Sequence, residues 1–275
     1  MIPIEVYSRS YIKAKPTNIK VIVLDLDETI GSFRELYLLW AFGLSSNIER
    51  NQHTFNELLD LYPEFLRYGI LNIIDYLKYK KNNGSYFKTF IYTNNVLPEE
   101  WVRLVINYIE HKQSAKGLFD KIIPGFGKSA NCMRTTRDKT YSDFIRCAVI
   151  PRHTEVCFID DTYFEKMEYP TVYYIQPKQY HHMMKTSDII DRFMKSRLSD
   201  QLNASDVRDF LYQTFIRNDA LNTIGKSLLE TKADILVSKK IMYHIKEFFL
   251  MSVRRHKTRK DRRDHGVGRF TRRKL

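Results

Sequence analysis

The stretch VIVLDLDETI, residues 21–30, decides the fold, because it joins a run of apolar residues directly to a cluster of acids. Val21–Leu24 is continuously apolar and mostly β-branched, which is typical of a buried strand. Asp25, Asp27 and Glu28 follow within four positions. Carboxylates this close repel one another unless a proton or a cation neutralises them. The stretch therefore predicts a buried strand whose end holds a positive group.

Similar apolar runs alternate with helical patterns along the chain. The runs predicted to be strands are IKVIVLD (19–25), FKTFIYTNN (87–95), FDKIIPGF (119–126), TEVCFIDD (154–161) and TVYYIQPK (171–178). Helical spacing of apolar residues predicts helices over 65–81, 98–111 and, more weakly, 139–149. Alternation of strands and helices is the pattern of an α/β fold with a parallel sheet and crossover helices.

Two helical regions lie outside this alternation. Residues 31–64 form a small cap insertion directly after the acidic cluster, and residues 198–253 form a helical extension. We therefore divide the chain into an N-terminal segment (1–18), an α/β domain (19–197) that contains the cap, the extension, and a basic tail (254–275) predicted to be disordered.

Charge is concentrated in that tail. Of the net charge of +13, residues 254–275 supply +9, from eleven Lys or Arg and two Asp. Such a segment favours contact with nucleic acid or another acidic partner, although it specifies neither, and a solvated end or a nuclear-localisation signal is the alternative. The part that precedes it is only mildly basic.

The cysteines and the hydropathy bear on the compartment. Cys132, Cys147 and Cys157 lack metal-ligand spacing and are odd in number, so we expect reduced core thiols. No window has the length and apolar character of a membrane span or a signal peptide. A soluble cytoplasmic or nuclear protein without a membrane partner is predicted, and the sequence leaves its oligomeric state open.

Polar residues of a particular kind end three of the predicted strands. They are the acidic cluster at 25–29, the run Thr93–Asn95, and the pair Asp160 and Asp161. In open α/β sheets ligands bind beyond the carboxyl ends of the strands, so four aspartates would share one crevice. A hard divalent cation with oxygen ligands would neutralise them, and Mg²⁺ is the natural candidate.

A site of this composition suits phosphoryl transfer, in which positioning and charge stabilisation do most of the catalysis. One carboxylate can attack phosphorus and form an aspartyl-phosphate. A second carboxyl two residues along the strand lies on the same face and can protonate the leaving oxygen. Asp25 and Asp27 have this spacing.

These motifs resemble those of the haloacid dehalogenase (HAD) superfamily. DLDET looks like its first motif, and the DxDxT form followed by IGSF is most similar to the FCP/SCP-type phosphatases of the RNA polymerase II C-terminal domain. IYTNN is similar to the second motif and VCFIDD to the fourth. For the third motif, a lysine, Lys139 in TRDKTYSDFI fits best, with Lys128 and Lys121 as weaker candidates. The resemblance covers roughly residues 19–197.

The resemblance implies a HAD-like Rossmannoid fold and a role for each matched residue. Asp25 would be the nucleophile and Asp27 the general acid and base. Thr93 would donate to the phosphate, and Lys139 would balance charge. Mg²⁺ would be held by Asp25, the Asp27 carbonyl and one or both of Asp160 and Asp161. Thr29 and Asn94 are further substrate-binding candidates, although Asn94 and Asn95 replace the small residues usual in the family.

The leading expectation is a Mg²⁺-dependent protein Ser/Thr phosphatase acting on a phosphorylated protein, because a cap of about 34 residues favours a macromolecular substrate by family analogy. A polynucleotide end phosphatase is the rival enzyme, favoured by the basic tail. A third reading is an assembly factor on a HAD scaffold. The chain is compatible with the FCP-like proteins of baculovirus- and nudivirus-like insect viruses, which serve nucleocapsid assembly.

Overall fold

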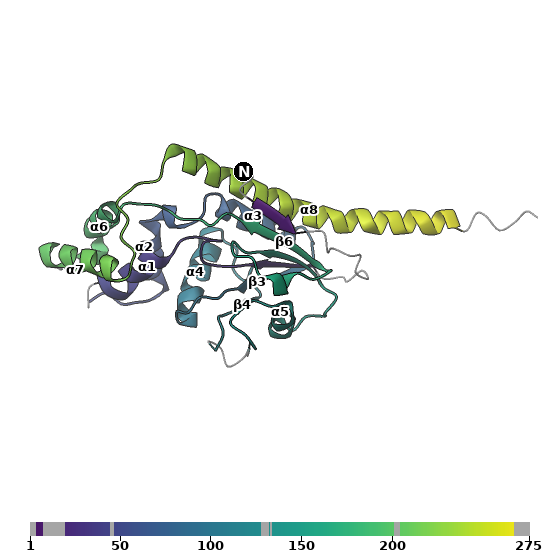
Figure 1. Ribbon diagram of the computed structural model, residues 1–275, viewed down its shortest axis with the longest axis horizontal. Helices are drawn as coiled ribbons and strands as arrows, with labels where there is room; N and C mark the ends of the chain where they lie inside the picture. The colour runs from purple at the N-terminus through teal and green to yellow at the C-terminus, as the bar shows by residue number, and fades with distance from the viewer. Residues whose placement is uncertain are drawn as a thin grey trace, which may run out of the picture.

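The computed structural model describes residues 4–7, 20–44, 47–127, 132, 134–200 and 204–266. Their core is a six-stranded sheet with the order β1-β6-β5-β2-β3-β4 (Figure 1). The strands are β1 (Ile4–Tyr7), β2 (Lys20–Leu24), β3 (Phe87–Tyr92), β4 (Lys121–Ile123), β5 (Glu155–Ile159) and β6 (Val172–Pro177). All neighbouring pairs are parallel except β1 with β6. The predicted α/β fold with a parallel sheet is confirmed.

Helices cover both faces of the sheet, as expected. Successive side chains of a strand point to opposite faces, and β2 follows this rule. Its Ile22 and Leu24 pack in one core with α3 (Ile70–Asn82) and α4 (Glu99–Lys112). Val21 and Val23 pack in a second core with α5 (Tyr141–Ala148). Burial on both faces explains why the strand is a continuous apolar run instead of an alternating one.

The order of the strands creates a switch point between β2 and β5. From β2 the chain proceeds to β3 and β4 on one side, and it then returns to β5 and β6 on the other. Leu24 at the end of β2 pairs with both Ile91 and Ile159. The residues that follow these strands therefore meet at one edge, where doubly wound sheets bind ligands.

The predicted cap contains α1 (Arg34–Leu38), a π-helical turn (Leu39–Gly43) and α2 (Gln52–Asp60), and a 3₁₀ turn at Pro63–Phe65 follows. Gly31 is required where the cap leaves the core. A Cβ at this position would lie 2.4 Å from the Phe33 ring and 2.5 Å from the Phe65 carbonyl oxygen. This close approach places α1 directly beside the end of β2.

The C-terminal extension is integrated with the α/β domain. After α6 (Thr186–Met194) it forms α7 (Ala204–Arg217), which packs on α6 and the cap, and α8 (Leu228–Gly266), which runs beside β6 (Figure 1). Leu211, Phe215 and the α8 residues Val237, Ile241, Ile245 and Phe248 belong to the same buried cluster as the sheet. Two further 3₁₀ turns lie at Glu165–Met167 and Arg197–Ser199.

Three expectations need correction. The segment 1–18 was given no element, yet Ile4–Tyr7 forms the edge strand β1. The tail was expected to be disordered, but the backbone of residues 254–266 continues α8, because Arg and Lys favour helix and the segment has no proline. Residues 267–275 lie outside the described part of the chain.

The third correction concerns the cysteines. Cys132 and Cys147 form a disulfide, because the loop that leads into α5 folds back on the helix end and brings their Cα atoms to 5.1 Å. Only Cys157, buried in β5, is the free core thiol that we expected. The argument from reduced thiols for a reducing compartment therefore fails for two of the three residues. Among the described helices, none combines the length and apolar character needed to cross a bilayer.

Candidate active site

A pocket of about 610 Å³ opens at the carboxyl ends of β2, β3 and β5. Its floor is polar and contains all four aspartates that the sequence placed at one crevice, together with Thr93 and Lys139. Its wall is largely apolar and comes from the cap, from the loop after β3 and from the start of α4, with Phe33, Tyr37, Phe42, Leu97 and Trp101 among its residues. The pocket therefore has one charged end and one apolar side.

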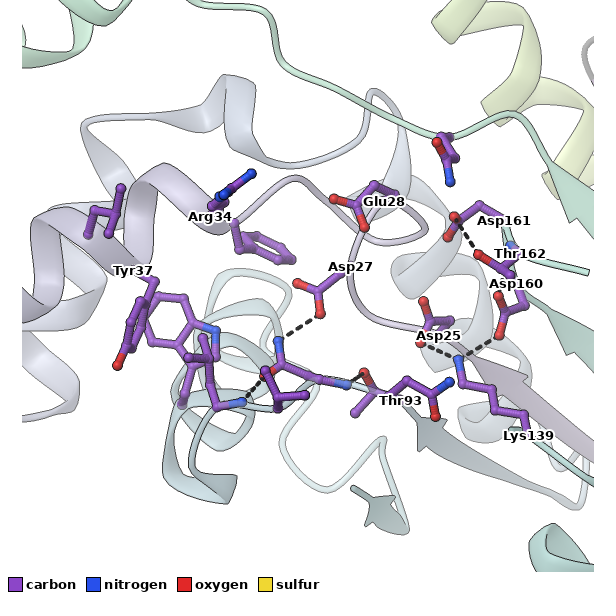
Figure 2. Close-up of a pocket in the computed structure, with 18 of the residues that line it drawn as sticks. Asp25, Asp27, Glu28, Arg34, Tyr37, Thr93, Lys139, Asp160, Asp161 and Thr162 are labelled. Atoms are coloured by element: carbon purple, nitrogen blue, oxygen red, sulfur yellow. Dashed lines mark hydrogen bonds and ion pairs between the residues drawn. The ribbon is translucent and has the colours of Figure 1, made fainter. Parts of the chain in front are cut away.

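Lys139 lies at the centre of the charged end, between two aspartates (Figure 2). Its Nζ is 2.5 Å from Asp25 Oδ1 and 2.6 Å from Asp160 Oδ2, and the lysine is 1% exposed. The next residue, Thr140, caps α5 by accepting a hydrogen bond from the Asp143 backbone N–H, which fixes the direction from which Lys139 enters.

This placement separates the three candidate lysines. Lys121 donates instead to the carbonyl oxygen of Cys147, 2.7 Å away, and does not line the pocket. Lys128 lies outside the described residues. Lys139 is thus the candidate that the fold brings to the acidic cluster.

Burial and crowding control the ionisation of the cluster. Burial raises the pKa of Asp25 above its usual value, against the opposing pull of Lys139. It also raises the pKa of Asp160 to about 8, and the nearby Asp25 adds to this effect. For Lys139, burial favours the neutral form, but Asp160 and Asp25 outweigh it and raise the pKa. If all of these aspartates were ionised, one buried lysine would leave them with excess negative charge, and their raised pKa values reflect that cost.

A metal ion would relieve that excess. Asp25, Asp160 and Asp161 are buried, and each can offer a carboxylate oxygen such that the three ligand atoms lie within 4.8 Å of one another. Lys139 pairs with Asp25 through Oδ1, which is one of the two carboxylate oxygens. An all-oxygen, all-carboxylate donor set suits a hard divalent cation. The residues present therefore fit a metal ion.

Thr29 contacts the acidic cluster through its hydroxyl group. Its Oγ1 donates to Asp161 Oδ1 (2.6 Å) and accepts from the Asp161 backbone N–H (3.0 Å). Both capacities of the hydroxyl are used, and Thr29 is not among the residues that line the pocket. In this structure Thr29 therefore orients a carboxylate of the cluster, and its role in substrate binding stays a prediction.

Thr93 and Asn94 line the pocket from the loop after β3, as predicted. Thr93 Oγ1 accepts the backbone N–H of Asn95 (3.0 Å), which leaves its own O–H free to donate to a ligand. Asn94 is exposed at the mouth of the pocket.

Asp27 lies apart from the metal-ligand cluster and points across the pocket (Figure 2). Its Oδ2 accepts a hydrogen bond of 2.7 Å from Asn95 Nδ2. Burial, with repulsion from Asp25 as the next cause, raises the pKa of Asp27 to about 6. A carboxyl with such a pKa can both donate and accept a proton near neutrality.

Several residues of the site were given no individual role by the sequence, although Glu28 belongs to the acidic cluster. Glu28 lines the pocket with φ at 55°, and burial with the nearby Asp27 raises its pKa to about 8.

The buried Arg67 donates to the carbonyl oxygens of Glu28, Thr29 and Lys178 and so braces the turn after β2. At the rim, Arg34 donates to the carbonyl oxygen of Asn218 beyond the end of α7. These contacts join residues far apart in sequence, which no local pattern reveals.

Comparisons of the chain with protein-family models, with curated proteins and with solved structures found no match. The functional argument therefore depends on the geometry of the site.

Proposed function

We propose that the protein is a Mg²⁺-dependent phosphomonoester hydrolase that works through an aspartyl-phosphate. The observation that carries the proposal is the position of Asp25 at the switch point of the sheet, with a buried lysine and two further aspartates around it. A carboxylate that lies beside a buried lysine is suited to attack an anionic phosphoryl group.

In the first step Asp25 Oδ2 forms a bond to phosphorus while the bond from phosphorus to the leaving oxygen breaks. Asp27 gives its proton to that oxygen, and an alcohol departs. In the second step the Asp27 carboxylate takes a proton from water, whose oxygen attacks phosphorus and releases Asp25. The products are inorganic phosphate and the free site.

Two cationic groups and one hydroxyl serve the phosphoryl oxygens. Lys139, charged because its pKa is raised, lies beside Asp25, and the Thr93 hydroxyl has an O–H to donate. When bound, Mg²⁺ would supply charge stabilisation for the transferring group. Asp25, Asp160 and Asp161 are the residues that would hold it.

A phosphorylated Ser or Thr side chain of a protein is the substrate that the pocket supports best. The pocket is larger than a phosphate group, and its wall offers apolar surface outside the acidic floor. Phe42, at the mouth, is 49% exposed, so the apolar surface reaches the solvent where a peptide would enter. A polynucleotide end finds fewer contacts here, because Arg34 and Lys139 are the cations among the lining residues.

The test is phosphate release from an aryl phosphate and from a phosphoserine peptide, with Mg²⁺ or with EDTA. Asp25→Asn keeps the shape of the side chain but is a poor nucleophile, so we expect turnover to fall by at least about 10³-fold. Asp75→Asn is the matched control, since Asp75 is exposed on α3 and does not line the pocket.

Loss of turnover in EDTA and in Asp25→Asn, but not in Asp75→Asn, is the expected result. Metal-independent turnover, or turnover that survives Asp25→Asn, would exclude the proposed mechanism. A folded wild-type protein inactive on both substrates and on phosphorylated oligonucleotides would favour the assembly factor instead.

A further inference from the structure

Asn95 makes three hydrogen bonds that lock its position. Its backbone N–H donates to Thr93 Oγ1 (3.0 Å), and its Oδ1 accepts from the Leu97 backbone N–H (2.7 Å). The second contact is a local turn of the type that asparagine favours. Its Nδ2 then donates to Asp27 Oδ2 at 2.7 Å. The amide group is held by the loop and bonded to a carboxylate 68 positions earlier in the chain.

The fold explains why these two residues meet. β2 and β3 are parallel neighbours with Leu24 opposite Ile91, so the segments that follow them run side by side. The loop after β4 supports the same contact, because Gly125 lies against this turn. A Cβ at Gly125 would be 2.7 Å from the carbonyl oxygen of Asn95, so only glycine lets the loops approach this closely.

The bond to Asn95 selects one orientation of the Asp27 carboxyl. Among the described residues, Asn95 supplies the only side-chain hydrogen bond to Asp27, and it uses Oδ2. Oδ1 accepts no hydrogen bond in the described part of the chain, and Asp27 lines the pocket. The carboxyl therefore presents one unbonded oxygen to the pocket while the other is fixed from behind.

We propose that Asn95 is a positioning residue that aims the general-acid carboxyl of Asp27 at the leaving oxygen, and that it thereby suits the site to alkyl phosphates such as phosphoserine. The inference rests on the proposed function. A serine alkoxide is a poor leaving group that needs a proton as the bond breaks, whereas nitrophenolate departs without one. General-acid catalysis contributes about 10²–10⁴-fold where the proton is needed.

The test compares kcat/KM for a phosphoserine peptide with kcat/KM for p-nitrophenyl phosphate in two variants. This ratio covers the steps up to release of the leaving group and leaves out the second step, in which Asp27 activates water for both substrates. Asn95→Ser keeps a neutral oxygen that can accept from Leu97 N–H but does not reach Asp27. Asn95→Asp keeps the size and that acceptor but replaces the donating amide. For each we expect kcat/KM on the peptide to fall about 10–100-fold, and kcat/KM on p-nitrophenyl phosphate to change by less than about 3-fold.

The affinity for inorganic phosphate, a competitive inhibitor, should stay within about 2-fold, because Asn95 acts through Asp27. Asn107→Ala is the control, since Asn107 is exposed on α4 and contacts Gln52 outside the pocket. It should leave both rates unchanged.

Each other outcome is decisive. An equal loss of kcat/KM on both substrates would show that Asn95 only maintains the loop, and no loss on either would show that Asp27 does not need Asn95. Both results would overturn the inference and leave the proposed hydrolase intact. A wild-type protein without turnover on either substrate would instead remove the hydrolase and the inference together.

Discussion

Lys139 shows at the scale of a single residue how the site tolerates its acids. Its side chain is 2% exposed, and its ammonium nitrogen lies within 2.6 Å of a carboxylate oxygen of both Asp25 and Asp160. Removing three charged groups from water is costly, and only their mutual attraction and good geometry compensate. The lysine is thus a structural counter-ion for the cluster as well as a candidate catalytic group.

Lys139→Ala should therefore destabilise the fold strongly when metal is absent. Two buried carboxylates would lose their cation, and breaking a buried ion pair costs about 3–5 kcal/mol of unfolding free energy. Mg²⁺ should restore part of this loss and stabilise the variant more than wild type, because the emptied site is more negative. Denaturant unfolding with EDTA and with Mg²⁺ measures both effects.

Lys166→Ala is the matched control for this experiment. Lys166 pairs with Asp138 at 3.6 Å, but both side chains are more than 60% exposed, so the change should stay within about 0.5 kcal/mol. A Lys139→Ala variant as stable as wild type in EDTA, or one that Mg²⁺ does not affect, would contradict the counter-ion role.

The sequence could predict the site residues that directly follow a strand. The ends of β2, β3 and β5 could be located from apolar runs, so Asp25, Thr93 and Asp160 were placed together before the structure was known. The hydrogen bond between Thr29 and Asp161 was not predicted, because the two residues are 132 positions apart in the sequence. Asn95 was noted only as a departure from a family pattern, since a loop's side-chain directions are not encoded by periodicity.

At the scale of elements, the segment between Cys132 and α5 delivers Lys139 and is restrained at several points. Arg134 Nη1 donates to the carbonyl oxygen of Thr93 (3.1 Å), and Thr135 N–H donates to Asp143 Oδ2 in α5 (2.8 Å). The disulfide from Cys132 to Cys147 closes the same segment. The loop therefore connects the end of β3 to the helix that positions the lysine.

Reduction of the disulfide should destabilise the protein through the unfolded chain. A cross-link over 15 positions removes loop-closure entropy worth about 3 kcal/mol. The unfolding free energy of the reduced protein should therefore be lower by about 3 kcal/mol, and its denaturant midpoint should be lower as well. A Cys132→Ser/Cys147→Ser variant should have the unfolding free energy of the reduced wild type, and this value should not change when reductant is added. Cys157→Ala should remain sensitive to reductant, because Cys157 is free. If the oxidised and the reduced protein have the same unfolding free energy, the cross-link does not restrain this loop.

At the scale of the whole molecule, the sequence predicted the parallel strands but not how the chain ends join them. Four of the five parallel strands, all but the short β4, are largely apolar runs of five or six residues, and burial on both faces makes such runs visible. β1 is four residues long and pairs with β6, about 170 positions later, so it has no local signal. The sequence predicts the extension as a separate helical block, yet its residues Phe215, Val237 and Ile245 pack in the same core as the sheet.

The position of α8 separates a structural part of the extension from a charged part. Residues up to Phe249 contribute to the core, and the helix then continues past the sheet (Figure 1). Residues 254–275 hold +9 of the +13 net charge. A chain that ends at Val253 should therefore keep its unfolding free energy and its turnover of aryl phosphate while it loses the electrostatic contribution to polyanion binding.

We expect the full chain to bind duplex DNA with an affinity that falls steeply with salt, since each phosphate neutralised releases counterions and adds about −0.9 to the slope of log K against log salt. The shortened chain should bind at least about 10-fold more weakly at 50 mM salt and with a shallower slope. Fluorescence anisotropy with labelled DNA from 50 to 200 mM salt measures both quantities. Equal affinity and equal slope in the two chains would assign any DNA binding to the folded part, whose charge is only +4 without the tail.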